Sequence, residues 1–196
     1  MTEISDKAAM RVRMRGLRRR LADATPDAGQ RAARRLPLSR FGRFSVVGGY
    51  CALGSEFDPD PILEAILGLD PGRMRRALPM ATDRRSSLRF RLWRPGEALV
   101  KDAFGIPAPP ASAPEVLPNL IVAPLLAFDR GGGRLGQGAG HYDRTLASLR
   151  AIRPVFVLGV AYAGQEVDRV PTGPHDQRLD AIVTETAYIE VARGSR

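Results

Sequence analysis

Apolar residues recur with helical spacing near the start of the chain. In residues 6–21 they fall at intervals of four, three and four positions, at Met10, Met14, Leu17 and Leu21. Such intervals place side chains on one stripe of an α-helix, so we expect a helix here with that stripe buried. A second helix is expected over residues 27–36, because Pro37 cannot continue it.

Other segments are apolar at almost every position, which is typical of strands buried on both faces of a sheet. The four clearest are residues 44–50, 120–123, 155–160 and 181–184. Further strands are expected over residues 75–79 and over 88–93, where apolar and polar residues alternate. Helices are expected over residues 59–67, which Asp58 can cap, and after the glycine-rich segment that ends near residue 140. The five prolines of residues 106–118 indicate a loop.

Alternation of buried strands with helices indicates an α/β fold, a layered single domain with a largely parallel central sheet flanked by helices. A chain of 196 residues can bury one sizeable core but would be cramped as two independent units. No internal repeat and no convincing linker divides it. We therefore expect residues 1–196 to form one domain.

The composition indicates in which cellular compartment the protein acts. No run of 18 apolar residues is present, and the N-terminus lacks the apolar core of a signal peptide, so we expect no membrane partner. The single cysteine, Cys51, cannot form a disulfide within one chain and suits a reducing compartment. We therefore expect a cytoplasmic protein, and a monomer.

The formal net charge is +9, and the arginines are concentrated between Arg11 and Arg35. Such a basic block can bind nucleic acid, bind anionic small molecules, or form a solvated helix face. Only 6% of the residues are aromatic, and none is interleaved with the block to stack on bases. We therefore expect no nucleic-acid partner. A nucleic-acid-binding accessory protein stays open as an alternative, and its affinity would fall steeply with salt.

Lys7 and Arg11 are candidates for binding an anion from the first helix. They lie four residues apart, so their charged groups share one helix face. Lys7 and Lys101 are the only lysines in a chain that otherwise uses arginine, and a lysine supplies the compact point charge that some chemistry needs. The alternative is that both residues are solvated charges of an amphipathic helix.

Residues 131–144 read GGGRLGQGAGHYDR and lead from a buried strand into a helix. Glycines at alternate positions allow backbone amides to converge on an anion, and a helix N-terminus favours phosphate. The spacing matches neither a P-loop nor the G-x-G-x-x-G dinucleotide fingerprint. A phosphate-binding loop and a flexible surface loop are therefore both open. Asp143, in the first helical turn, either answers the helix dipole or holds Mg²⁺ beside a phosphate.

Residues 134–143 (RLGQGAGHYD) resemble the R-L-G-x-G-x-G-x-Y-D pattern of the 5-formyltetrahydrofolate cyclo-ligase family at every fixed position. Further segments resemble the family in the same order, over almost the whole chain: residues 7–11, 55–57, 78–79, 88–91, 104–109, 165, 171, 175–176 and 182–185. Ala108 stands where members often have Glu, and His141 where they commonly have an aromatic residue. Gln137 and Ala139 occupy variable positions.

The resemblance implies roles for individual residues. Contacts to ATP are implied for Lys7, Arg11, Arg134, Leu135, Gly136, Gln137, Gly138, Ala139, Gly140, His141 and Tyr142. Catalysis is implied for Lys7, Arg134 and Tyr142, and contact with the folate for Cys51, Glu56 and Tyr142. Asp143 and Asp176 are implied as carboxylates that bind Mg²⁺.

Several of these residues also have simpler explanations. Asp176 lies in a turn-forming segment where Asp commonly bonds its own backbone, and Glu56 can be turn polarity. Cys51 follows a buried strand and fits an inert wall better than a nucleophile. The two histidines, His141 and His175, lack the spacing of a zinc site.

The activity that the resemblance implies is the closure of 5-formyltetrahydrofolate to 5,10-methenyltetrahydrofolate with ATP and Mg²⁺. The implied substrate is a folate that can carry a polyglutamate tail. In this reaction the γ-phosphoryl group activates the formyl oxygen and N10 then attacks. Phosphoryl transfer depends on positioning and charge neutralisation, so amide groups, Lys7 and Arg11 suit it without a nucleophilic side chain. A relative that binds these ligands but has lost turnover is a further alternative.

Overall fold

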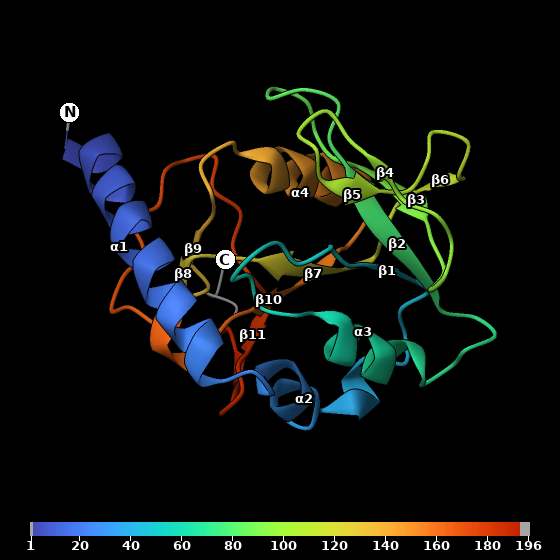
Figure 1. Cartoon of the computed structure of the whole chain (residues 1–196), viewed down its shortest axis with the longest axis horizontal. Coiled ribbons are helices and arrows are strands. Elements are labelled where there is room, and N and C mark those ends of the chain that lie inside the picture. Colours follow the sequence, from blue (N-terminus) through green and yellow to red (C-terminus); the bar gives the residue numbers. More distant parts are fainter. Residues whose placement is uncertain (1, 193–196) are drawn as a thin grey trace.

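The computed structural model describes residues 2–192, and side chains from residue 6 onward. An eight-stranded sheet forms its centre (Figure 1). In spatial order its strands are β12 (Tyr188–Glu190), β11 (Ala181–Val183), β10 (Phe156–Val160), β7 (Leu120–Pro124), β1 (Val46–Gly48), β2 (Arg75–Met80), β3 (Arg89–Leu92) and β6 (Glu115–Val116). The five strands from β11 to β2 are parallel, whereas β12, β3 and β6 pair antiparallel at the two edges. The predicted α/β fold with a largely parallel sheet is confirmed.

Helices cover both faces of the sheet. They are α1 (Thr2–Ala24), α2 (Ala28–Ala33), α3 (Asp60–Leu67) and α4 (His141–Ile152), with short 3-10 turns η1 (Leu38–Arg40) and η2 (Ala163–Gln165). In Figure 1, α2 and α3 lie on one side of the sheet and α4 on the other. α1 runs along the side near the short strands β8 (Ala127–Phe128) and β9 (Arg134–Leu135). Within residues 2–192, no helix is both long and apolar enough to cross a bilayer.

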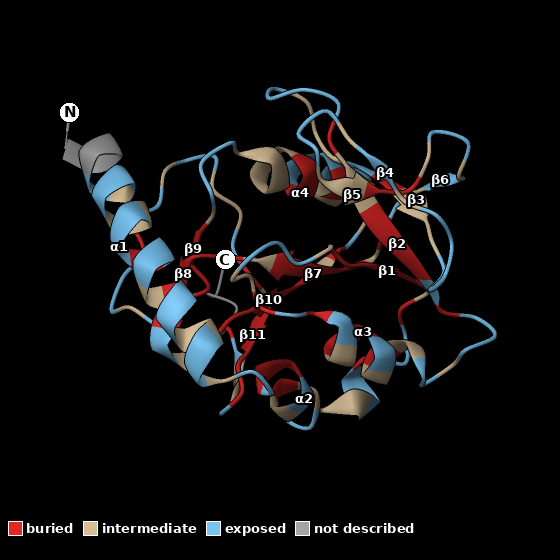
Figure 2. Ribbon diagram, viewed as in Figure 1, coloured by how far each residue is buried: buried red, intermediate tan, exposed pale blue. Residues whose placement is uncertain are grey.

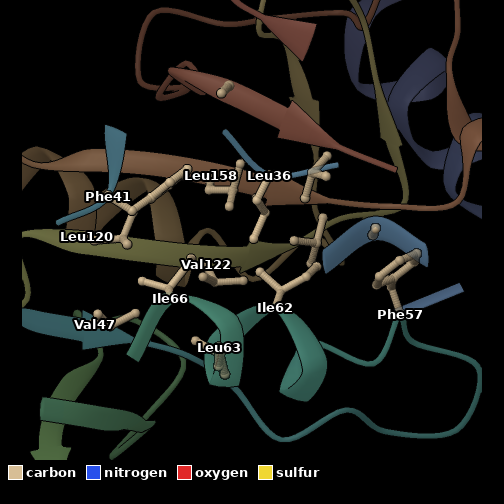
Figure 3. Close-up of a cluster of buried hydrophobic side chains, with 14 of the residues drawn as sticks. Leu36, Phe41, Val47, Phe57, Ile62, Leu63, Ile66, Leu120, Val122 and Leu158 are labelled. Atoms are coloured by element: carbon tan, nitrogen blue, oxygen red, sulfur yellow. The ribbon is translucent and has the colours of Figure 1, made fainter. Parts of the chain in front are cut away.

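Alternate residues of the strands enter two separate cores, because successive side chains of a strand point to opposite faces. On one face Leu120 and Val122 of β7 pack with Ile62, Leu63 and Ile66 of α3, as Figure 3 shows. On the other face, the residues of β7 at positions 121 and 123 pack with those of α4 at positions 146 and 149. Figure 2 shows the resulting pattern, with buried strands between helices whose outer faces are exposed.

The apolar stripe of α1 packs on a small two-stranded sheet formed by β8 (Ala127–Phe128) and β9 (Arg134–Leu135). Met14 is fully buried there beside Leu126 and Leu135, with Met10 and Leu17 partly buried around it. The predicted stripe is therefore confirmed for these three residues, and it fixes α1 against the segment that leads into the glycine-rich loop. Leu21, its fourth member, is partly buried against the core that contains α2 and α3.

Three sequence predictions need correction. The prediction that residues 106–118 form only a loop was wrong, because this segment contains β5 (Pro107–Ala108) and β6. β5 pairs with β4 (Val100–Lys101) in an isolated two-stranded sheet, where a proline can stand on a strand edge that needs no N–H donor. The second helix ends at Ala33, earlier than predicted, and the chain continues through turns before Pro37. The first helix extends beyond the predicted residues 6–21 at both ends.

Candidate active site

A cavity of about 840 Å³ opens where parallel strands end. Its wall includes Tyr50 and Cys51 after β1, Ala81 after β2, and Pro124 and Leu125 at the end of β7. The carboxyl ends of adjacent parallel strands are the usual position of a ligand site in an open α/β sheet. All fifteen residues predicted to bind ATP, folate or metal line this cavity.

The N-terminal helix supplies a cationic wall. Lys7, Arg11 and Arg18 all line the cavity, and their spacings of four and seven residues place them on one helix face. Lys7 Nζ lies 2.5 Å from Asp176 Oδ2, so the predicted ATP-binding lysine is ion-paired with a predicted metal ligand. Arg11 Nε donates to the carbonyl oxygen of Gly136 at 3.1 Å, which joins the helix to the glycine-rich loop.

Arginine side chains hold the glycine-rich loop by its carbonyl groups. Besides the bond from Arg11, Arg15 Nη2 donates to the carbonyl of Gln137 at 3.3 Å, and Arg144 Nη2 donates to the carbonyl of Ala139 at 2.9 Å. Among the described residues, no amide N–H of residues 136–140 has a hydrogen-bond partner. The loop therefore presents a row of free amide donors at the start of α4, an arrangement suited to an anion.

Two glycines give the loop its backbone shape. Gly138 has φ of +112° and Gly140, which caps α4, has φ of +69°. These left-handed conformations are open to glycine and strained for residues with a Cβ atom. A Cβ atom at Gly138 would also lie 3.3 Å from the guanidinium carbon of Arg11. Both positions therefore favour glycine, and the backbone shape of the loop depends on them.

Arg134 and Tyr142 form a compact group beside this loop. The Arg134 side chain is only 3% exposed; its Nη2 donates to Asp143 Oδ1 at 2.9 Å, and its guanidinium carbon lies 5.5 Å from the Tyr142 ring centroid. Burial, and next the negative charge of Glu56, raise the pKa of Tyr142 well above its usual value. Tyr142 therefore keeps its proton at neutral pH and can act as a hydrogen-bond donor in the cavity.

The two predicted metal ligands, Asp143 and Asp176, are linked through the backbone of Gln177, the residue after Asp176. Asp143 Oδ1 accepts a bond from the N–H of Gln177 at 3.1 Å, and Asp176 Oδ2 accepts one from the N–H of Gly173 at 2.7 Å. Burial alone would raise the pKa of Asp176, but the hydrogen bonds from Lys7 and Gly173 and the charges of Lys7 and Arg134 bring it below its ordinary value.

The donor set fits a magnesium ion shared with a nucleotide. Within the described part of the chain, no three His, Cys, Asp or Glu side chains cluster as a complete metal site. Each of Asp143 and Asp176 keeps one carboxylate oxygen without a protein donor in that part of the chain. Mg²⁺ is commonly held by one or two carboxylates with phosphate oxygens completing its shell, so these two oxygens are suitable ligands.

A second group of residues lies at the other end of the cationic helix face. Glu56 is 13% exposed, its Oε1 lies 3.6 Å from Arg18 Nη1, and its Oε2 accepts a bond from the N–H of Leu53 at 3.2 Å. Cys51 lies nearby, and burial raises the pKa of its thiol, only partly opposed by the charge of Arg76. Cys51 is thus a protonated wall residue, as its position after a buried strand predicts.

Sequence reasoning missed several residues of the cavity. Arg18 is 7% exposed, and its spacing of seven residues from Arg11 was a signal that could have found it. Phe104 stands at the cavity wall with its ring centroid 5.6 Å from that of His141. Asp102 orders its turn by accepting bonds from the N–H groups of Phe104 and Ile106. Phe104 and Ile106 belong to the stretch 104–109 that resembles the family, and the resemblance implied no site role for them.

A smaller hollow of about 510 Å³ adjoins the cavity. The two share Arg134 and Asp176, and the smaller one is further lined by Arg169 and Arg178. Arg134 and Asp176 therefore stand between two spaces, with the larger space containing the glycine-rich loop.

Comparison with known proteins identifies the family of the chain. The sequence profile of the 5-formyltetrahydrofolate cyclo-ligase family matches residues 3–185. A 5-formyltetrahydrofolate cyclo-ligase of Mycolicibacterium smegmatis is 34% identical over 158 residues, which cover 75% of this chain and 77% of the relative. The Escherichia coli K12 5-formyltetrahydrofolate cyclo-ligase is 30% identical over 184 residues, covering 89% and 99%. The NMR structure of Aquifex aeolicus 5,10-methenyltetrahydrofolate synthetase superposes with a TM-score of 0.70 at 25% identity, covering 100% and 96%.

Proposed function

The chain belongs to the 5-formyltetrahydrofolate cyclo-ligase family, and for its cyclo-ligase activity we propose a reaction that consumes ATP, requires Mg²⁺ and yields 5,10-methenyltetrahydrofolate, ADP and phosphate. One observation carries this proposal. Residues 136–140, whose amide groups have no partner among the described residues, line one cavity of about 840 Å³ together with the cations of α1 and with Asp143 and Asp176.

The proposed chemistry has two steps. In the first, the formyl oxygen attacks the γ-phosphorus of ATP, the bond from that phosphorus to the bridging oxygen breaks, and ADP leaves. In the second, N10 attacks the activated formyl carbon, loses its proton, and expels the oxygen as inorganic phosphate. The carbon then bridges N5 and N10 as the methenyl group, so the oxygen of the formyl group ends in phosphate.

The residues near the glycine-rich loop have the properties that phosphoryl transfer needs. The amide donors of residues 136–140, Lys7 and Arg11 would bind the triphosphate and neutralise its charge, with the loop segment 134–142 wrapped around it. Arg134 would add a buried positive charge beside the transferred group, and Tyr142 a neutral hydroxyl donor. Such preorganised donors act strongly where bound substrates exclude water.

Asp143 and Asp176 would hold the magnesium ion, through the oxygens that accept no bond from the described residues. When bound, the ion would neutralise phosphate charge and orient the triphosphate. Lys7 now pairs with Asp176, so we propose that nucleotide binding moves the Lys7 ammonium from the carboxylate to a phosphate.

The folate would occupy the part of the cavity near Glu56, Cys51 and Tyr142. The half-buried Glu56 carboxylate can accept hydrogen bonds from the N–H groups of the pterin, and the Cys51 thiol offers an apolar wall. A polyglutamate tail would be attracted by the net charge of +9. We further propose a monomeric, single-domain enzyme acting in the cytoplasm, which size-exclusion chromatography and localisation in cells can test.

The deciding experiment follows methenyltetrahydrofolate by its absorbance. Purified protein with 5-formyltetrahydrofolate should form product only when ATP and Mg²⁺ are both present, and ADP and phosphate should appear in equal amounts with it. Omission of ATP, omission of Mg²⁺ and replacement of ATP by a non-hydrolysable analogue are the controls. Product formation without ATP would contradict the proposal, as would ATP hydrolysis that does not depend on the folate.

A further inference from the structure

Arg18 is the most deeply buried cation on the cavity face of α1. It is 7% exposed, lines the cavity, and lies on the same helix face as Lys7 and Arg11. Burial of a guanidinium group is costly unless it has a partner, so a buried arginine at a ligand cavity requires a reason. Its charged neighbour among the described residues is Glu56.

Position along the helix separates Arg18 from the ATP-binding cations. Seven residues of α-helix advance about 10 Å, so Arg18 lies about that far from Arg11 along the axis. Arg11 contacts Gly136 of the glycine-rich loop, whereas Arg18 contacts Glu56 and donates from Nε to Ser55 Oγ at 3.4 Å. One helix face thus reaches two different ends of the cavity.

The geometry of the Arg18–Glu56 pair leaves the carboxylate able to bind a ligand. The 3.6 Å separation of Nη1 and Oε1 is too long for a hydrogen bond, so the guanidinium balances the charge without occupying that oxygen. The other oxygen, Oε2, accepts a single bond from the N–H of Leu53. A nearly buried carboxylate with a compensated charge and spare acceptor positions is suited to binding N–H donors.

We infer that Arg18 is a positioning residue for folate binding: its guanidinium group balances the charge of the Glu56 carboxylate and keeps it oriented toward the N–H donors of the substrate. This inference rests on the proposed folate side of the cavity. It requires that loss of Arg18 weaken folate binding through Glu56 and leave ATP binding nearly unchanged.

The test combines Arg18→Met, which keeps the apolar stem and removes the charge, with Glu56→Gln and the double variant. Arg18→Met should raise the KM for 5-formyltetrahydrofolate about tenfold, because a hydrogen bond to a charged group is at stake, and change the KM for ATP by less than about twofold. In the Glu56→Gln background the same substitution should change the folate KM by less than about twofold, since its partner is already gone. Arg18→Lys should recover part of the affinity, and Arg19→Met, at an exposed position of the same helix, should behave as wild type.

Equal rises of both KM values, or effects of Arg18→Met and Glu56→Gln that simply multiply, would overturn the inference. Calorimetric titration of 5-formyltetrahydrofolate into each variant tests the role of Arg18 separately from the proposed reaction, because binding is measured without ATP or turnover. A wild-type protein that binds folate but forms no product would refute the proposed reaction. The ratio of the folate dissociation constants of Arg18→Met and wild type would still test the role of Arg18.

Circular dichroism checks that each variant folds. If Arg18→Met does not fold, the Arg18→Lys and Arg18→Gln variants are compared with wild type. Equal folate affinity in all three proteins contradicts the inference.

Discussion

The ammonium group of Lys7 lies 2.5 Å from a carboxylate oxygen of Asp176, although 169 positions separate these residues in the sequence. Their ion pair joins the first helix to the turn that follows η2 at the wall of one cavity. In the proposed reaction Lys7 would bind a phosphate of ATP and Asp176 would bind the magnesium ion. The free enzyme therefore neutralises each group with the other, and nucleotide binding would separate them.

Replacement of Lys7 by alanine should weaken the use of ATP and leave the fold intact. The KM for ATP should rise about tenfold or more, because a charge-assisted contact contributes about 1.5–3 kcal/mol. The folate KM should change little. Lys101→Ala is the matched control, since Lys101 is exposed in β4 and outside the cavity lining. Wild-type ATP kinetics in the Lys7 variant would remove this residue from the ATP site.

Asp143→Asn should raise the magnesium concentration needed for half-maximal activity by about tenfold, because an amide is a weaker ligand than a carboxylate for a hard cation. The substitution keeps the shape of the side chain and an oxygen that can accept from Arg134 and from the N–H of Gln177. A magnesium titration at saturating ATP and folate measures the effect. Asp23→Asn, on the exposed side of α1, is the control. Identical titrations of the Asp143 variant and wild type would exclude Asp143 as a metal ligand.

The Lys7–Asp176 pair should make a pH-dependent contribution to stability. The pKa of Asp176 is lower in the folded protein than its ordinary value of about 3.9. Asp176 therefore contributes its full stabilisation above that ordinary value, and the contribution is lost as the pH falls through the lower pKa of the folded state. Asp176→Asn should reduce the free energy of unfolding by about 1 kcal/mol at pH 7, with a smaller difference below pH 4. Urea unfolding of both proteins across this range measures it, and a difference that grows on acidification would contradict the assignment.

Gly138→Ala should damage the ATP site through backbone strain. A Cβ atom at φ of +112° is unfavourable by about 1–2 kcal/mol and would press on Arg11, so ATP affinity should fall about tenfold. Gly16→Ala is a sharp contrast, because Gly16 lies inside α1 with no atom within 4 Å of the added carbon. That change should raise the free energy of unfolding by about 0.5–1 kcal/mol and leave ATP affinity unchanged. Equal ATP affinity in the Gly138 variant and wild type would show that the loop shape is not needed.

Hydrophobic spacing predicted most of the elements because it reports local geometry directly. The stripe of Met10, Met14 and Leu17 is buried as expected, and the apolar segment at residues 120–123 is the strand β7 at the middle of the sheet. Prediction failed in the proline-rich segment, where β5 pairs with the nearby β4 and β6 pairs with β3, each over only two residue pairs. Pairing across the sheet has no signal in the local composition of these short strands.

The glycine-rich motif and the spacing of Lys7 and Arg11 were readable as candidate chemistry because each is contained in one short segment. The amino-acid sequence by itself determined the type of fold, the amphipathic first helix and the family to which the chain belongs. Only the tertiary structure decided that Lys7 meets Asp176 and that Arg18 lies beside Glu56. Such contacts join residues that are distant in the chain, and they exist only once packing of the helix on the sheet has fixed where each side chain can reach.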